Sequence, residues 1–208
     1  MPQGYFFSLD GIDGSGKTTQ CRLLAEWLRQ QGRSVTLCRD PGGTALGERL
    51  REILLGHRSI TVMSELLLFM ASRAQLVAEV IRPALERGEI VLADRFLLAS
   101  VVYQGHVGGL EPEEIWRLGQ WATQNTLPDL TVVLDLPAEC VPQRKPTPAD
   151  AFEQRGLEFL QRVRQAYLHE AQRHPDKMIV VSAQRPVAEV LADLQREFAR
   201  VLSAHSRS

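Results

Sequence analysis

The chain has 208 residues and a formal net charge of −1, with 44% hydrophobic and 24% charged residues. These values fit one globular domain with a sizeable core. They give no overall attraction to nucleic acid or to an anionic membrane. We therefore expect a single domain over 1–208, no nucleic-acid or membrane partner, and phosphate recognition by local clusters of residues.

Three widely spaced cysteines, Cys21, Cys38 and Cys140, form no CxxC pair. An odd number at this spacing argues against a disulfide framework and against a zinc site. No apolar run approaches the roughly 20 residues of a membrane span. The first predicted strand begins after four residues, which leaves no room for a secretory signal. These features predict a cytoplasmic protein.

Short apolar runs alternate with helical patterns along the chain. In chain order, the first half is predicted to contain a strand at Tyr5–Asp10, a helix at Lys17–Gln31, a strand at Ser34–Cys38, a short helix ending near Leu55, a long helix from an N-cap at Ser64 toward Gly88 with a kink or break at Pro83, and a strand at Ile90–Ala93. The second half is predicted to contain helices at Leu97–Tyr103 and Pro112–Asn125, a strand at Leu130–Leu136, a mobile loop at Pro142–Ala149, a helix at Ala151–Arg173, a strand at Met178–Val181 and a helix from Pro186. Strands separated by helices imply an α/β fold, with a five-stranded parallel sheet flanked by helices on both faces.

The strongest motif lies between the first predicted strand and the first helix. It reads Gly11-Ile12-Asp13-Gly14-Ser15-Gly16-Lys17-Thr18-Thr19 and matches GxxxxGK[ST]. Its glycines let backbone N–H groups turn toward phosphate oxygens at the positive end of a helix. We expect Lys17 to be a solvent-facing charge for the β- and γ-phosphates, and the Thr18 hydroxyl to bind Mg²⁺. The segment is the predicted ATP site, but many P-loop enzymes share this donor site, so the acceptor needs other residues.

Phe69 and Arg73 are four residues apart in a predicted helix, so their side chains share one face. A ring and a guanidinium on one face can grip a base, one by stacking and the other by hydrogen bonds to its edge. The alternative is a core phenylalanine beside a surface arginine.

Asp94 and Arg95 close a predicted strand, where open parallel sheets place their ligand crevice. Arg95 can hold an acceptor phosphate bidentately, and Asp94 can help organise Mg²⁺ or its waters. The alternative is an ordinary ion pair at a strand end. Asp13 is an unusual acid inside a phosphate loop, and repulsion from phosphates leads us to expect an outward orientation toward the acceptor.

Five segments taken in order resemble bacterial thymidylate kinase, a P-loop nucleoside monophosphate kinase family, and the resemblance covers nearly all of residues 5–200. Besides the P-loop, they are Arg39-Asp40-Pro41-Gly42-Gly43-Thr44, Phe69-Met70-Ala71-Ser72-Arg73, Asp94-Arg95-Phe96 and Tyr103-Gln104-Gly105. The resemblance implies a P-loop NTPase fold with an inserted lid at approximately 142–153. It also implies a homodimer and transfer of phosphate from Mg-ATP to dTMP, giving ADP and dTDP.

The resemblance implies roles for single residues. Phe69 matches the family residue that stacks on thymine, and Arg73 matches the one that binds its exocyclic oxygen. Tyr103 matches a tyrosine that lies against the deoxyribose and disfavours a 2′-hydroxyl, with Gln104 beside it. Asp13 matches a carboxylate that reaches the sugar 3′-hydroxyl. The expected substrate-binding set is Asp13, Pro41, Arg51, Phe69, Arg73, Arg95, Tyr103 and Gln104.

The source of a catalytic arginine departs from the family pattern. The family carries this arginine either in the P-loop, where this chain has Gly14, or in the lid, where Ala151 replaces the usual arginine. Arg144 is the best remaining candidate, because its planar fork can bridge donor and acceptor oxygens, and Lys145 and Arg155 follow it. The expected catalytic set is Lys17, Arg95, Arg144 and Asp13.

A second departure is Ala99, where the family usually has serine, with Ser100 displaced by one position. Two alternatives stay open: another nucleoside or nucleotide kinase on the same scaffold and, because the lid departs from the family pattern, a catalytically weak nucleotide-binding regulator. The histidines share no spacing and are expected to be solvated or to cap helices, and the tryptophans to lie in the core or an interface.

Overall fold

A five-stranded parallel sheet forms the centre of the computed structural model, which describes residues 4–56, 60–144 and 156–204. Its strands are β1 (Tyr5–Asp10), β2 (Val35–Arg39), β3 (Ile90–Asp94), β4 (Leu130–Asp135) and β5 (Met178–Ser182). They lie in the order β2-β3-β1-β4-β5, and every neighbouring pair is parallel. The predicted sheet is confirmed, and each strand ends within one residue of its predicted bounds.

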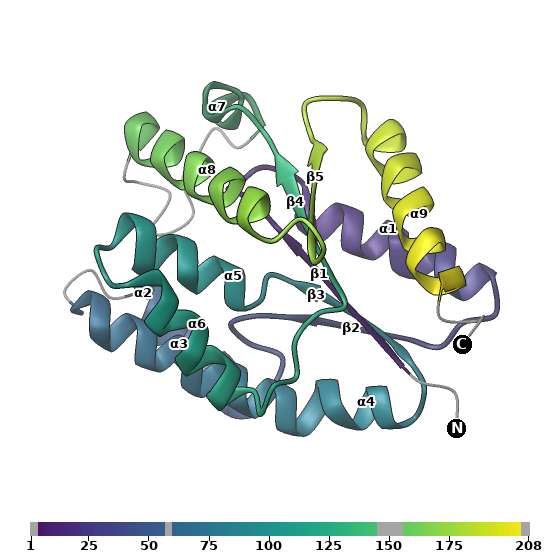
Figure 1. Ribbon diagram of the computed structural model, residues 1–208, viewed down its shortest axis with the longest axis horizontal. Helices are drawn as coiled ribbons and strands as arrows, with labels where there is room; N and C mark the ends of the chain where they lie inside the picture. The colour runs from purple at the N-terminus through teal and green to yellow at the C-terminus, as the bar shows by residue number, and fades with distance from the viewer. Residues whose placement is uncertain (1–3, 57–59, 145–155, 205–208) are drawn as a thin grey trace.

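Helices cover both faces of the sheet, as Figure 1 shows. The helices are α1 (Lys17–Gln30), α2 (Ala45–Gly56), α3 (Val62–Leu76), α4 (Arg82–Glu86), α5 (Leu97–Ser100), α6 (Pro112–Ala122), α7 (Val141–Arg144), α8 (Gly156–Arg173) and α9 (Val187–Ala204). Two π-helical segments, η1 (Val77–Ile81) and η2 (Val101–Val107), and a 3₁₀ turn, η3 (Ala138–Cys140), complete the described elements. Helices α1 and α9 pack together on one side of the sheet, and α3, α5, α6 and α8 lie on the other.

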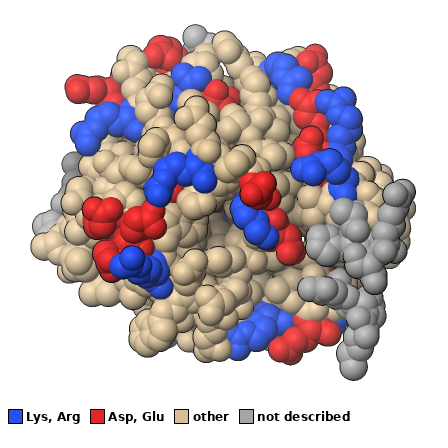
Figure 2. Space-filling model, viewed as in Figure 1, with Lys and Arg blue, Asp and Glu red and all other residues tan. Residues whose placement is uncertain are grey.

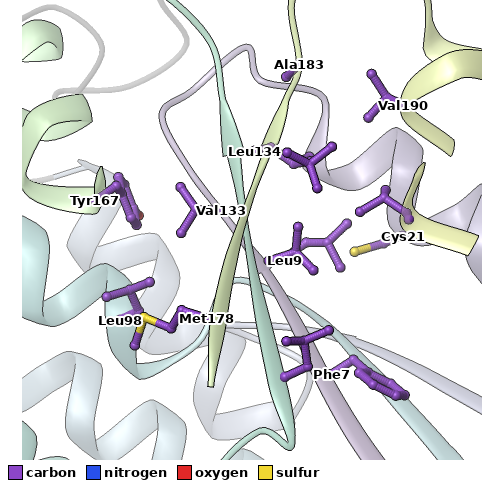
Figure 3. Close-up of a cluster of buried hydrophobic side chains, with 14 of the residues drawn as sticks. Phe7, Leu9, Cys21, Leu98, Val133, Leu134, Tyr167, Met178, Ala183 and Val190 are labelled. Carbon is purple, nitrogen blue, oxygen red and sulfur yellow. The ribbon is translucent and has the colours of Figure 1, made fainter. Parts of the chain in front are cut away.

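The core lies on both sides of the sheet, because strands covered twice carry apolar residues on both faces. In β1, Phe7 and Leu9 are 0% exposed, and Phe7 stacks on Phe198 of α9 at 4.2 Å between ring centroids. Figure 3 shows Cys21 on the α1 side of the strands and Tyr167 on the α8 side. Both layers of helices are thereby held to one sheet.

The long helix predicted from Ser64 begins earlier than expected. Thr61 is the N-cap, and its side chain accepts a hydrogen bond from the Ser64 backbone N–H at 3.2 Å. Near Pro83 the α-helix is interrupted, because the π-helical segment η1 precedes the proline and α4 begins one residue before it. Proline has no backbone N–H to donate, and its ring clashes with the preceding turn of a regular α-helix. A π-helical turn before the proline changes the hydrogen-bond pattern and so makes room for the ring.

Two further segments differ from the predicted elements. The helix predicted over Leu97–Tyr103 continues as the π-helical segment η2 to Val107. The loop predicted from Pro142 begins instead with the short helix α7, which ends at Arg144. The rest of the predicted lid, 145–153, lies outside the described residues, as does the predicted start of the next helix at Ala151.

Basic and acidic side chains are interspersed on the face of the molecule in Figure 2 rather than gathered by sign. Many of them pair with one another, as Arg39 does with Glu48 at 2.7 Å. Within the described ranges, no helix combines the length and the apolar character that a membrane crossing requires.

Candidate active site

The predicted site residues meet at one edge of the sheet. The parallel register places Leu9 of β1 and Arg39 of β2 opposite Asp94 of β3, so the three strands end together. The P-loop follows β1, Asp40 follows β2 and Arg95 follows β3. Because ligands of open parallel sheets bind beyond the carboxyl ends of the strands, this edge is the expected position of a nucleotide site.

The P-loop depends on its glycines for its backbone path. Gly11, Gly14 and Gly16 have φ angles of 132°, 78° and 93°, which L-residues with a side chain rarely adopt. A Cβ atom at Gly11 would also lie 2.5 Å from the carbonyl oxygen of Leu134. Helix α1 starts at Lys17, directly after Gly16, so its N-terminal N–H groups adjoin the loop.

Lys17 is 6% exposed, so the expectation that it faces solvent is wrong. Its Nζ donates to the carbonyl oxygens of Gly11 at 3.1 Å and Ile12 at 2.8 Å, which draw the side chain back over the loop. Burial, followed by the charge of the nearby Arg95, lowers the pKa of Lys17 to about 8. The ammonium nevertheless borders the cleft described next.

A wide cleft opens beside the P-loop. Its lining joins loop residues to the ends of β2 and β3 and to α7: Asp13, Gly14, Gly16, Lys17, Thr18, Thr19, Arg39, Asp40, Arg51, Leu55, Asp94, Arg95 and Arg144. The Thr18 hydroxyl donates to a carboxylate oxygen of Asp94 within this cleft. Two oxygen groups side by side suit a hard cation such as Mg²⁺, so these residues fit the predicted metal site.

A second, smaller pocket adjoins the first. It is lined by Asp13, Asp40, Pro41, Arg51, Leu55, Phe69, Arg73, Arg95, Ala99, Tyr103 and Gln104. All eight residues expected to bind the substrate are among them. The cleft and the pocket share Asp13, Arg51 and Arg95, so a group held in one can reach a group held in the other.

Arg73 lies at the bottom of the pocket and is 1% exposed, whereas Phe69 is half-buried. The alternative of a core phenylalanine beside a surface arginine is therefore wrong. The Nε of Arg73 donates to Asp40 at 2.5 Å, while Nη2 donates to Ser100 and Phe96 and Nη1 to Met70. A guanidinium has five N–H donors, and among the residues that the structure describes these contacts leave one hydrogen of Nη1 for a ligand.

The departure from the serine pattern has a structural counterpart. Ala99 lines the pocket, whereas Ser100 is buried behind it and its hydroxyl accepts from Arg73 Nη2 at 3.0 Å. The serine at position 100 therefore orients the arginine, and the methyl group at position 99 faces the ligand space.

Arg95 lines both the cleft and the pocket. Its φ of 72° lies in the left-handed region, which non-glycine residues adopt rarely and which is enriched at active sites. Nη1 donates to Gly11 O at 3.0 Å and to the Tyr167 hydroxyl at 3.1 Å, and Nη2 donates to Asp13. Burial opposes its charge, but Asp13 and the nearby tyrosines raise the pKa of Arg95 well above its usual value. Arg95 pairs with Asp13 and Asp94 bonds to Thr18, so the two neighbours do not form the strand-end ion pair considered above.

The segment η2 supplies Tyr103 and Gln104. Gln104 is 1% exposed, and its Nε2 donates to Glu65 of α3 at 3.2 Å. The Arg95 guanidinium lies 5.6 Å from the centroid of the Tyr103 ring, which places this ring beside the residue expected to hold the acceptor phosphate. Burial raises the pKa of Tyr103 above its usual value, so the phenol stays neutral at physiological pH.

Two buried residues behind Arg95 have no counterpart in the predicted set. Tyr167 of α8 accepts from Arg95, and its hydroxyl lies 3.5 Å from Asp10 at the end of β1. Burial raises the pKa of Asp10 to about 7, although Arg95 and Lys17 act to lower it. Tyr167 lies in an ordinary helical pattern, and no local motif in the sequence marks it.

Replacing Asp10 with asparagine is expected to stabilise the fold above pH 7 and to leave it unchanged near pH 4. The folded-state pKa of about 7 lies above the usual value of 3.8, so folding increasingly opposes ionisation as the pH rises between these values. Asparagine removes this penalty, and we expect a gain on the order of 2 kcal/mol at pH 8. Thermal unfolding at pH 4 and pH 8 measures it, with the exposed Asp176→Asn as control. Equal shifts at both pH values would contradict the expectation.

Comparisons with known proteins agree with this geometry. The sequence model described as thymidylate kinase matches residues 9–194. The thymidylate kinase of Bifidobacterium longum (strain DJO10A) is 45% identical over 199 residues, covering 93% of this chain and 97% of the relative. That of Clavibacter sepedonicus is 46% identical over 209 residues, covering 99% of each. A crystal structure of thymidylate kinase from Ehrlichia chaffeensis superposes with a TM-score of 0.79 at 31% identity, covering 95% of this chain and 99% of the other. The chain belongs to the thymidylate kinase family.

Proposed function

We infer that this chain transfers the terminal phosphoryl group of ATP to dTMP through the residues of the two cavities, giving ADP and dTDP. The observation that carries this assignment is the junction of the P-loop cleft with the pocket at Asp13, Arg51 and Arg95. A nucleotide seated in each cavity would place its phosphates at the shared wall. Donor and acceptor can then meet without moving between separate sites.

In the donor cleft, we assign the phosphate chain of ATP to the backbone N–H groups of 11–19 and to the ammonium of Lys17. The buried ammonium lies where developing negative charge needs a fixed cation, and few waters compete with it. Thr18 and Asp94 would hold Mg²⁺. When bound with ATP, the ion neutralises charge on the β- and γ-phosphates.

In the acceptor pocket, we assign the thymine ring to Phe69 and Arg73, and the sugar to Tyr103 and Asp13. The free Nη1 hydrogen of Arg73 supports this assignment, because Asp40 and Ser100 hold the guanidinium in one orientation. Pro41 and Gln104 complete the wall of the pocket.

We assign binding of the acceptor phosphate to Arg95 and Arg51, which line both cavities. Arg51 is held there by its Nη1, which donates to the carbonyl oxygen of Pro41 at 2.9 Å. Because the attacking group is already an oxyanion, the transfer needs no general base. The residues act by positioning the two phosphates in line and by neutralising their charge.

A coupled assay that follows ADP release tests the function. The protein is incubated with Mg-ATP and, in turn, with dTMP, dUMP, UMP, dCMP, dAMP and dGMP, and once without Mg²⁺. We expect the highest kcat/KM with dTMP and no turnover in the absence of the metal ion. Preference for another monophosphate would overturn the assignment of the pocket, and binding of ATP without turnover on any of them would overturn the assignment as an enzyme.

Replacing Phe69 with alanine is expected to raise KM for dTMP about tenfold or more, with KM for ATP within twofold of the wild type. Stacking of a base on an aromatic ring contributes about 1–3 kcal/mol. Phe69 lines the acceptor pocket and does not line the P-loop cleft, so the effect should be confined to dTMP. Steady-state kinetics with each substrate varied in turn measures the effect. Leu157→Ala is the control, because Leu157 is an apolar side chain that is 46% exposed and does not line the pocket. Equal rises in both KM values would remove Phe69 from the acceptor site.

We also propose a homodimer located in the cytoplasm. Met63 and Leu67 of α3 and Trp121 of α6 are large apolar side chains with exposed fractions of 51%, 52% and 80%, and the two helices pack against each other. Exposed apolar side chains on neighbouring helices favour contact with a second copy. Sedimentation velocity distinguishes a particle of two 23.3 kDa chains from a monomer.

The proposed location in the cytoplasm rests on the cysteines. All three are free in the structure, which suits a reducing compartment.

A further inference from the structure

Helix α8 contributes a fully buried carboxylate, Glu170, which has no part in the reaction assigned above. Its Oε1 lies 2.8 Å from Nε2 of His106 and accepts from Nη1 of Arg173 at 3.1 Å. Its Oε2 accepts from the indole N–H of Trp116 at 2.9 Å, and His174 Nε2 lies 3.5 Å away. One carboxylate thus joins α8 to α6 and to the π-helical segment η2.

These contacts keep Glu170 ionised inside the protein. Burial acts to raise its pKa, but the hydrogen bonds from His106, Trp116 and Arg173 outweigh burial and lower it below the usual value. An ionised carboxylate without such partners would cost several kcal/mol to bury. The carboxylate and its donors therefore fix one another in position.

The contact with His106 matters because of the segment in which this residue lies. His106 belongs to η2, three residues after Tyr103 and two after Gln104, both of which line the acceptor pocket. A π-helical segment is rarely stable by itself and is frequent at functional sites, so its position depends on tertiary contacts. Helices α6 and α8 both pack against η2. The hydrogen bond from His106 to Glu170 therefore fixes η2 through a residue that does not itself line the acceptor pocket.

The alternative role for this cluster is to bind a metal ion. His106, His169 and Glu170 place three possible ligand atoms within 4.8 Å of one another. However, Oε1 of Glu170 already has two partners, His106 and Arg173, and one of them is a guanidinium. A fixed positive charge 3.1 Å from the ligand oxygen opposes a cation at the same place. The cluster is therefore better explained as an anchor between side chains.

We propose that Glu170 is a positioning residue of the acceptor site, which fixes the segment of Tyr103 and Gln104 through His106 and so sets the affinity for dTMP without touching it. This inference rests on the proposed function of that pocket. It concerns the acceptor alone, because Glu170 and His106 border neither the P-loop cleft nor its metal site.

Three variants test the proposal. Glu170→Gln keeps the size of the side chain and removes its charge, and His106→Phe keeps a ring and removes the bond to Glu170. Both are expected to raise KM for dTMP about tenfold, with KM for ATP within twofold of the wild type. Trp116→Phe is the matched control, because it removes a donor from the same carboxylate in α6 rather than in η2. It is expected to lower Tm and to leave both KM values unchanged.

Isothermal titration of dTMP supplies a readout that does not depend on turnover. If Glu170→Gln does not fold, His106→Phe carries the test alone. The proposal is overturned if both variants lower Tm but bind dTMP as the wild type does, or if Trp116→Phe weakens dTMP equally. These outcomes leave the proposed function intact, because the wild type would still phosphorylate dTMP. A wild type that does not phosphorylate dTMP defeats the proposed function itself, and with it this inference.

Discussion

Replacing Lys17 with alanine is expected to reduce kcat/KM by at least a thousandfold, on the scale of other groups that stabilise the transferring phosphoryl charge. The ammonium is buried and fixed by the carbonyl oxygens of Gly11 and Ile12. It therefore needs no reorganisation when charge develops, and no other lysine lines the cleft among the described residues. The coupled assay at saturating dTMP, with ATP varied, measures the loss.

The buried position of Lys17 requires a stability control. Alanine leaves two loop carbonyl oxygens without their donor, so thermal unfolding must show that the variant is folded under assay conditions. Lys177→Ala is the matched variant, since Lys177 is exposed and outside the cleft, and should retain wild-type kinetics. A folded Lys17→Ala variant that keeps more than about a tenth of wild-type kcat/KM, a loss below about 1.4 kcal/mol, would refute the assignment of the P-loop.

The pKa of Lys17 adds a pH dependence to the same prediction. Burial lowers this pKa to about 8, so the free enzyme loses the ammonium as the pH rises through 8. Because kcat/KM reports ionisations of the free enzyme, kcat/KM for ATP should decline above pH 8. A flat profile to pH 9.5 would show that the ammonium keeps its proton over this range or is not needed.

The fold could be predicted from the sequence because its signals are local. Each strand is a short apolar run next to a glycine or a charged residue, and the P-loop is a contiguous motif between β1 and α1. Phe69 and Arg73 could be paired because helical spacing alone places them on one face. The shared edge of β1, β2 and β3 then follows from parallel pairing.

The remaining features depend on contacts between distant parts of the chain. Nothing near Tyr167 indicates that its hydroxyl meets Arg95, 72 positions away. His106 was expected to be solvated or to cap a helix, but it bonds to Glu170, which is 64 positions away and fully buried. The burial of Lys17 follows from the way its side chain folds back onto the carbonyl oxygens of its own loop, which no spacing rule expresses.

Replacing Arg144 with alanine is expected to lower kcat about 10³-fold with little change in either KM, the effect of losing an arginine that stabilises the transferring phosphoryl group. Such a cation is needed because Gly14 cannot supply it from the P-loop. Arg144 borders the cleft together with Lys17 and Thr18, and α7 places it there. Its Nη2 donates to the carbonyl oxygen of Ala183 at 2.7 Å, which holds the guanidinium near the mouth of the cleft.

Rapid-mixing and steady-state kinetics on purified protein, with Tm recorded for each variant, measure this effect. Arg144→Lys is expected to recover part of kcat, because a point charge replaces the charge but not the planar fork that can bridge donor and acceptor oxygens. Arg117→Ala is the control, since Arg117 is 72% exposed, pairs with Glu114 and lies outside the cleft. If Arg144→Ala keeps kcat within threefold of the wild type, Arg144 does not neutralise the phosphoryl charge. The role would then pass to Lys145 or Arg155, which lie outside the described residues, and the same variants at those positions would identify the cation.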